Sequence, residues 1–214
     1  KLLASGGGDG TVRIWNVAET APVGSAEHGE WINSVCFAPS GQHVASGSRD
    51  GSAKLFTVET GQVLGTIQAH PGKNVSTVVF SPDGRRLVTA GGDGHVRIFD
   101  LKEKKIERDI AAHTGWVWGA CFSSLGDRLL TCGSDGSARI WSAETGLQLV
   151  SFDGHGGDVL SAAFSPDDVF VVTACKDGGV SFWEVDSGRT LFRIVAHEGA
   201  ANSVNYAPDG LHIV

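Results

Sequence analysis

The sequence lacks methionine, has a single tyrosine, and carries only four cysteines in 214 residues. No two cysteines are separated by just two residues, which excludes a disulfide framework and a zinc knuckle. No apolar run approaches the roughly 18 residues that a membrane span needs. Basic residues number 17 and acidic residues 24, for a formal charge of −7. This balance argues against a general nucleic-acid or anionic-membrane binder, because both partners need a basic face.

Both ends of the sequence fall within strand-like stretches, at residues 1–5 and 211–214. We therefore expect a piece of a longer chain. A targeting segment could lie outside it, so the sequence leaves the compartment open, with the cytoplasm or nucleus favoured.

What the sequence has in abundance is glycine, 30 of 214 residues, without the every-third-residue period of collagen. Many of these glycines belong to a phrase that recurs about every 42 residues. The phrase ends in Asp-Gly, and its aspartates are Asp9, Asp50, Asp93, Asp135 and Asp177. Histidines keep the same interval at His28, His70, His113, His155 and His197. Aromatic residues do so at Trp15, Phe56, Phe99, Trp141 and Trp183. Three independent markers with one period indicate a structural repeat.

Each repeat has the pattern of four short strands. In residues 70–112, apolar alternation over 78–80 is followed by a Ser-Pro-Asp-Gly turn, a strand at 86–89 and an Asp-Gly turn at 93–94. A third strand follows at 95–99, and the polar stretch 105–111 suits an outer edge. No stretch of 10–12 residues has a 3.6-residue period, so we expect almost no helix.

The pattern predicts an all-β chain of four-stranded antiparallel blades that bury their faces against one another around an axis. Partial blades are expected at residues 1–27 and 197–214. The four complete blades are expected at residues 28–69, 70–112, 113–154 and 155–196.

These repeats resemble the WD-repeat β-propeller family along the whole chain. The family pattern is a Gly-His pair, a strand, a Ser-Pro-Asp-Gly turn, a strand ending near Asp-Gly, and a strand ending in Trp-Asp. Only His155 follows a glycine here, and no Trp-Asp pair is present. The resemblance rests on the period and on the spacing of 22 or 23 residues from histidine to aspartate. It implies a propeller, seven-bladed when complete, of which this chain would be an open arc.

The resemblance also implies a buried hydrogen-bond chain inside each blade, in which aspartate, histidine, a hydroxyl and an indole N–H are joined. Two blades keep all four members: His113, Thr131, Asp135 and Trp141 in one, and His155, Thr173, Asp177 and Trp183 in the other. The blades of His28 and His70 carry Phe56 and Phe99, which have no donor, so we expect their network to stop at the hydroxyl. Because the set recurs in every blade, we interpret it as structural and expect no catalysis.

The sequence favours neither a metal nor another cofactor. The in-register histidines belong to different blades, and the other histidines follow no ligand spacing. The glycine-rich stretch 6–10 precedes a strand rather than a helix, so it lacks the helix N-terminus that holds phosphate. Cys36 and Cys121 occupy the same place in the first strand and are interpreted as buried spacers, as are Cys132 and Cys175.

Partner binding is expected at positions that vary between blades and point toward one rim of the propeller. These positions lie just ahead of the first strand and just before the turn aspartate. We call the following set the rim residues: Trp31, Asn33, Arg49, Trp116, Trp118, Ser134, Asp158, Leu160 and Lys176.

Among the rim residues Trp118 stands out. Its neighbour Val117 is expected to face the core, so in a strand Trp118 should face the opposite way, toward the rim or the axial channel. Trp118 could be a partner hot spot, or it could plug the channel or pack against the adjoining blade. Trp31 and Trp116 recur at one register, which favours half-buried loop packing over partner contact.

The sequence thus predicts a non-catalytic scaffold that docks partner proteins or peptides, as a subunit of a multiprotein complex and without nucleic acid or membrane. The alternative is the sensing or docking arm of a larger enzyme, such as a kinase or nucleotidase, whose catalytic domain would lie outside these 214 residues. The fold alone does not distinguish the two.

Overall fold

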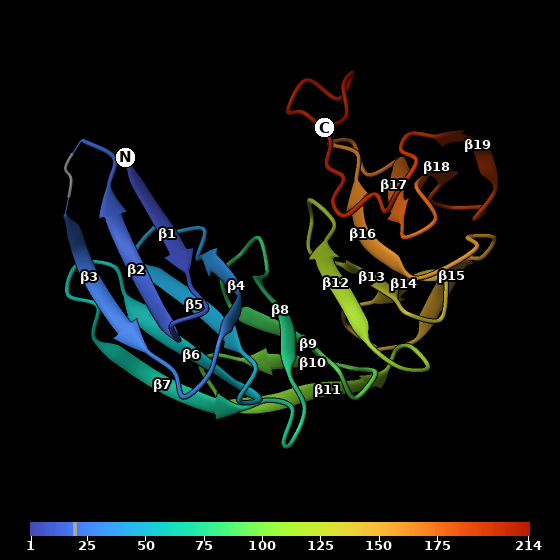
Figure 1. Cartoon of the computed structure of the whole chain (residues 1–214). Helices are drawn as coiled ribbons and strands as arrows, with labels where there is room; N and C mark the ends of the chain where they lie inside the picture. Colours follow the sequence, from blue (N-terminus) through green and yellow to red (C-terminus); the bar gives the residue numbers. More distant parts are fainter. Residues whose placement is uncertain (19–20) are drawn as a thin grey trace. The chain divides into compact units, whose positions relative to one another are not determined.

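The computed structural model describes residues 1–18 and 21–214, which form nineteen β-strands and no helix (Figure 1). The strands make five antiparallel sheets in which chain neighbours are sheet neighbours. The first sheet has three strands and the other four have four each. The prediction of an all-β chain built from four-stranded blades is confirmed. Within the described part of the chain, no helix is long and apolar enough to cross a membrane.

The strands are named in chain order. The first sheet holds β1 (Leu2–Gly6), β2 (Thr11–Asn16) and β3 (Pro22–Glu27). The second holds β4 (Ile32–Phe37), β5 (His43–Ser48), β6 (Ser52–Thr57) and β7 (Val63–Gln68). The third holds β8 (Val75–Phe80), β9 (Arg86–Gly91), β10 (His95–Asp100) and β11 (Lys105–Ala111). The fourth holds β12 (Val117–Phe122), β13 (Arg128–Gly133), β14 (Ala138–Ser142) and β15 (Gln148–Phe152). The fifth holds β16 (Val159–Phe164), β17 (Phe170–Cys175), β18 (Gly179–Glu184) and β19 (Thr190–Val195).

The Asp-Gly turns join the second and third strands of the four complete sheets, as expected from their sequence, and the turn at residues 9–10 joins β1 and β2 of the first sheet. In the second sheet, Gly51 has φ of 82°, which a side chain would disfavour. The carboxylate of Asp50 accepts hydrogen bonds from the backbone N–H and the hydroxyl of Ser52, at 2.8 and 2.6 Å. The aspartate therefore fixes its own hairpin as well as facing the histidine network.

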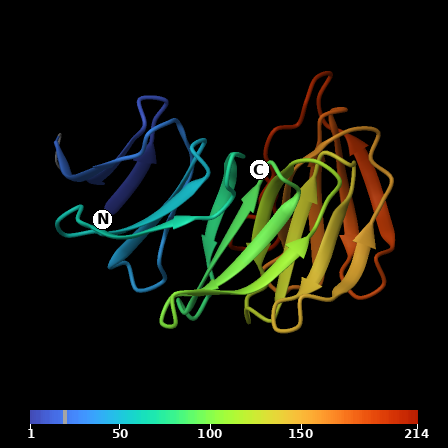
Figure 2. The same ribbon diagram turned by 90° about the horizontal axis from the view of Figure 1, so that it is seen from below.

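The chain forms two compact units. Unit 1 comprises residues 1–93 and 97–107, and unit 2 comprises residues 94–96 and 108–214. In unit 1, β1 packs against β4 and β4 packs against β8, so the first strands of successive sheets adjoin. In unit 2, β12 and β13 pack against β16, and the two complete sheets stand side by side (Figure 2, yellow and orange-red).

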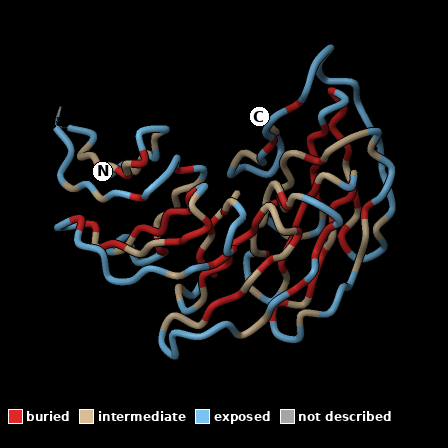
Figure 3. Tube along the Cα trace, turned by 60° about the horizontal axis from the view of Figure 1, so that its bottom comes forward, coloured by how far each residue is buried: buried red, intermediate tan, exposed pale blue. Residues whose placement is uncertain are grey.

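The cores lie between neighbouring sheets of each unit. In unit 1, one cluster joins the first two sheets around Ile14 and Phe56, and another joins the second and third around Val78 and Leu87. In unit 2, Leu130, Ile140 and Phe152 of the fourth sheet pack against Val159, Val171 and Trp183 of the fifth. Buried segments follow the inner strands, whereas outer strands such as β19 are exposed (Figure 3).

Candidate functional site

The His113 network, formed by His113, Thr131, Asp135 and Trp141, lies inside the fourth sheet. The indole N–H of Trp141 donates to Thr131 Oγ1 at 3.0 Å, and His113 Nε2 lies 2.8 Å from the same oxygen. His113 Nδ1 lies 2.9 Å from Asp135 Oδ1. Because Nδ1 faces a carboxylate, the ring proton is assigned to Nδ1, and the threonine hydroxyl donates to Nε2.

Neighbouring groups complete the His113 network. The hydroxyl of Ser137 donates to Asp135 Oδ1 at 2.7 Å and lies 3.3 Å from His113 Nδ1. Arg139 forms an ion pair with Asp135 Oδ2 at 3.1 Å. Burial by itself would raise the pKa of Asp135, but the hydrogen bonds from Ser137 and His113 outweigh it and hold that pKa well below its ordinary value. Burial lowers the pKa of His113, and Asp135 offsets only part of that effect, so the ring is neutral at pH 7.

The His155 network, formed by His155, Thr173, Asp177 and Trp183, is incomplete. His155 Nε2 lies 2.6 Å from Thr173 Oγ1, and the indole of Trp183 donates to that oxygen at 2.8 Å. His155 Nδ1 is buried and has no hydrogen-bond partner among the described residues. Asp177 instead accepts from the guanidinium of Arg193 at 2.8 Å. The expected link between His155 and Asp177 is therefore absent.

Two substitutions relative to the fourth sheet lie beside the missing link, and the first of them accounts for it. Two residues before the aspartate, the fourth sheet has Gly133 and the fifth has Cys175. A Cβ on Gly133 would lie 2.6 Å from His113 Nδ1, so a side chain at this register displaces the histidine. Two residues after the aspartate, Ser137 is replaced by Gly179, which offers no hydroxyl to the ring.

In unit 1, the two complete sheets end their chains at the hydroxyl, since phenylalanine has no donor. His70 lies 2.9 Å from Thr89 Oγ1 and 2.8 Å from Asp93. His28 Nε2 lies 2.7 Å from Ser46 Oγ, while its Nδ1 is 3.1 Å from Ser52 Oγ and 3.4 Å from Asp50. The distance between histidine and aspartate thus differs between these two blades.

A β-bulge occurs at one register in all four complete sheets, in the first strand where it pairs with the second. The extra residue at the bulge is Asn33, Ser76, Trp118 or Leu160. Bulges redirect side chains out of the pleat. Three of the rim residues, Asn33, Trp118 and Leu160, therefore occupy the bulge position, which has no regular partner on the second strand.

In unit 2 the structure brings four rim residues together. The rings of Trp116 and Trp118 stack with centroids 5.0 Å apart. Trp118 also donates its indole N–H to Asp158 of the next sheet at 3.2 Å and packs beside the core between the two sheets. Ser134 Oγ accepts from the backbone N–H of Trp116 at 2.9 Å. Trp118 is half-buried and spans two sheets, as in the packing alternative.

The remaining rim residues are more open. Trp31 is 51% exposed, and the guanidinium of Arg49 lies 4.2 Å from its ring centroid. Asn33 donates to the backbone carbonyl of Val75 in the third sheet at 2.8 Å. Lys176 is exposed and Leu160 half-buried. The structure thus groups Trp31 with Arg49, while Lys176 and Leu160 join neither aromatic pair.

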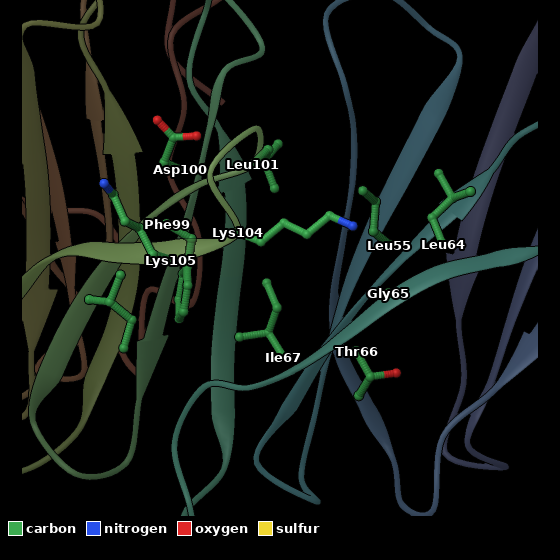
Figure 4. Close-up of a pocket in the computed structure, with 11 residues that line it drawn as sticks. Leu55, Leu64, Gly65, Thr66, Ile67, Phe99, Asp100, Leu101, Lys104 and Lys105 are labelled. Carbon is green, nitrogen blue, oxygen red and sulfur yellow. The ribbon is translucent and has the colours of Figure 1, made fainter.

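Sequence reasoning missed an apolar pocket in unit 1, between the outer strands of the second and third sheets (Figure 4). Leu64 and Ile67 of β7, Leu55 of β6 and Ile106 of β11 line it, and the Lys104 side chain extends across it. The exposed apolar residues of β7, Val63 and Leu64, were the sequence feature that could have indicated this pocket. Reasoning from the sequence also placed Cys175 among the spacers, although it stands where three other repeats have glycine.

Four-stranded antiparallel sheets that repeat about every 42 residues and enclose a histidine–hydroxyl–indole network define a WD-repeat β-propeller. A family model described as the IFT122 first beta-propeller matches residues 1–214, and the chain belongs to that family.

Curated relatives match shorter segments. The guanine nucleotide-binding protein subunit beta of Oryza sativa subsp. indica is 39% identical over 75 residues, 34% of this chain and 20% of the relative. Protein tipD of Dictyostelium discoideum is 36% identical over 76 residues, 34% of this chain and 12% of the relative. Human apoptotic protease-activating factor 1 is 39% identical over 70 residues, 28% of this chain and 5% of the relative. Each match spans a fifth or less of the relative's length.

Proposed function

We propose that this protein is a non-catalytic scaffold that docks partner proteins or peptides on the rim residues. The observation that carries the proposal is the bulge shared by all four complete sheets. A constant frame presents a different side chain at that register in each blade, which is the arrangement expected of a recognition surface.

The comparisons support the scaffold class. WD-repeat propellers act generally as protein-interaction scaffolds, and one relative is by its name a subunit of a guanine nucleotide-binding protein. The formal charge of −7 agrees with a protein partner rather than nucleic acid or an anionic membrane. The alternative of an enzyme's docking arm gains no support from these relatives.

Trp31 and Arg49 are the rim residues best placed to meet a partner. Both are exposed, and stacking holds the guanidinium over the indole, so little side-chain freedom remains to be lost on binding. Tryptophan and arginine are also enriched among interface hot spots. Trp118 contributes through its accessible part and positions Asp158 beside it.

The experiment is Trp31→Ala in the full-length protein, with partners recovered from native extract and quantified by mass spectrometry. Recovery of the specific partners should fall about tenfold or more, as for a hot spot of at least about 1.4 kcal/mol. Arg49→Ala should reduce recovery less.

The matched control is Leu125→Ala, which also removes an exposed apolar side chain, at 85% exposure, from the turn at the far end of a first strand. Leu125→Ala should leave recovery unchanged. Equal recovery with Trp31→Ala and wild type, at equal stability, would remove this part of the rim from the interface.

A further inference from the structure

Three side chains with metal-binding atoms gather where β17 meets its Asp-Gly turn. His155 Nδ1, Cys175 Sγ and a carboxylate oxygen of Asp177 all lie within 4.8 Å of one another. Cys175 is fully buried, and His155 Nδ1 is the buried nitrogen without a hydrogen-bond partner in the described chain. The hydrogen-bond network therefore leaves a nitrogen, a sulfur and an oxygen ligand atom close together.

The hydrogen bonds of Thr173 assign the tautomer of His155. The threonine oxygen accepts the indole N–H of Trp183 at 2.8 Å, and its hydroxyl donates to the carbonyl of Ser181 at 3.4 Å. With its proton used there, the hydroxyl accepts a second hydrogen bond, from His155 Nε2–H. Nδ1 then carries an unshared lone pair, which is the form of imidazole that binds a metal.

We propose that His155, Cys175 and Asp177 form a zinc site in the fifth blade, with water as the fourth ligand. Imidazole, thiolate and carboxylate together suit Zn²⁺. Tetrahedral zinc bonds of about 2.0–2.3 Å place ligand atoms roughly 3.3–3.6 Å apart, so separations within 4.8 Å need to shorten by no more than about 1.5 Å. The Asp177 side chain is 24% exposed and gives the ion a path from solvent.

Zinc binding requires the thiol of Cys175 to lose its proton. In the metal-free protein the thiol donates to the carbonyl of Gly157 at 3.3 Å. When the zinc–sulfur bond forms, the S–H bond breaks and one proton passes to solvent. Arg193, whose guanidinium bonds Asp177, competes with the metal for that carboxylate.

No other blade offers the same set. The position of Cys175 is held by Gly7, Ser48, Gly91 and Gly133 in the other repeats, and none of these has a thiol. Ser48 shows that a small side chain with a hydroxyl is accepted at this register. The sequence-based expectation of no metal compared histidines between blades and cysteines by their spacing, whereas this site combines one histidine, one cysteine and one aspartate within a single blade.

The test is titration of the full-length protein with Co²⁺, a spectroscopic substitute for zinc, followed by displacement with Zn²⁺. We expect one equivalent to bind with a thiolate-to-cobalt charge-transfer band, release of a proton, and loss of the band when zinc is added. Cys175→Ser should abolish the band and weaken zinc binding at least about 100-fold, and Asp177→Asn should weaken it at least about tenfold.

Cys132→Ala is the control, because it removes another buried thiol of the same unit and should leave the band intact. Arg193→Gln should tighten cobalt binding several-fold by releasing the carboxylate. Absence of a charge-transfer band in wild type, or an equal band in Cys175→Ser, would overturn the proposal. Weaker binding in Arg193→Gln would argue against Asp177 as a ligand.

Discussion

The fourth and fifth sheets follow one plan but close their networks differently. Both hold a histidine between a threonine hydroxyl and an aspartate, and both receive an indole N–H at that hydroxyl. In the fourth sheet the histidine bonds at both nitrogens, whereas His155 bonds only at Nε2. The four residues that define the network are therefore not sufficient to complete it.

The difference lies in two neighbours of the network. Gly133 leaves room for the His113 ring beside Asp135, and Ser137 adds a hydroxyl that holds both. Cys175 and Gly179 stand in their places in the fifth sheet. Glycine two residues before the aspartate thus decides whether the histidine reaches it, because the third sheet, with Gly91 and no hydroxyl at residue 95, also keeps its histidine 2.8 Å from Asp93. The hydroxyl of Ser137 adds a contact to a link that is already made.

The largest expected effect is the removal of each histidine. His113→Ala removes one partner each from Asp135 and Thr131 and leaves a buried cavity, and we expect it to lower the free energy of unfolding by about 3 kcal/mol. His155→Ala removes a histidine already lacking one bond, and should cost roughly half as much. Urea denaturation of the full chain, followed by tryptophan fluorescence, measures both values.

His95→Ala is the control for this pair, because it removes a half-buried histidine of the same unit whose ion pair with Asp109 lies at the surface, and it should change stability by less than about 0.5 kcal/mol. Equal losses for His113→Ala and His155→Ala would show that the bond to Asp135 adds nothing to stability.

The second prediction converts the fourth sheet toward the fifth. Gly133→Ala places a methyl group against the His113 ring and should cost about 1–3 kcal/mol, because the ring must leave Asp135. Gly65→Ala serves as the control, since a Cβ there meets nothing within 4 Å. The His113 imidazole signals in NMR spectra should shift in Gly133→Ala. An unshifted ring with unchanged stability would contradict the steric explanation.

The repeat, the strands and their turns were predictable because their signals are local. Each Asp-Gly turn and each alternating strand is encoded within a few residues. The same turn recurs at five aspartates with one period, which makes the pattern easy to recognise. The family, which is confirmed, was predictable from the same period of aspartates, histidines and aromatic residues.

The state of each network was not predictable from its four members. Whether His155 reaches Asp177 depends on the volume at Cys175, which is an effect of packing. The bulge that redirects Trp118 likewise depends on how two strands pair. Comparison of the five repeats at the glycine position was the one sequence signal that pointed to Cys175.

The third prediction concerns pH. Burial lowers the pKa of both His113 and His155 in the folded chain, and the nearby aspartates offset it in part. The unfolded chain binds protons near the ordinary value of about 6.5, so stability is full above that pH and falls as the pH drops below it. The loss is at most about 1.4 kcal/mol per pH unit for each histidine.

The two sheets should differ in this respect too. Asp135 bonds His113 directly and raises its pKa back toward the ordinary value, whereas Asp177 acts on His155 through its charge alone. His155→Gln should therefore flatten the fall in stability between pH 7 and 5 more than His113→Gln. Unfolding is measured with a chelator present, so that protons alone compete for His155. Stability that rises on acidification would refute the direction.

The smallest expected effect is a repair of the fifth sheet. Gly179→Ser returns the hydroxyl that Ser52 and Ser137 supply in other blades, 3.1 and 3.3 Å from the histidine Nδ1. The three atoms nearest to the new Cβ all belong to the guanidinium at the end of the flexible Arg193 side chain, which can move. One hydrogen bond to a buried, unpartnered nitrogen should add about 0.5–1 kcal/mol to the free energy of unfolding. If Gly179→Ser instead destabilises the chain, then the ion pair of Arg193 with Asp177 contributes more stability than a new hydrogen bond to His155 Nδ1. The fifth blade would then depend more on the Arg193 contact of its outer strand than on its histidine network.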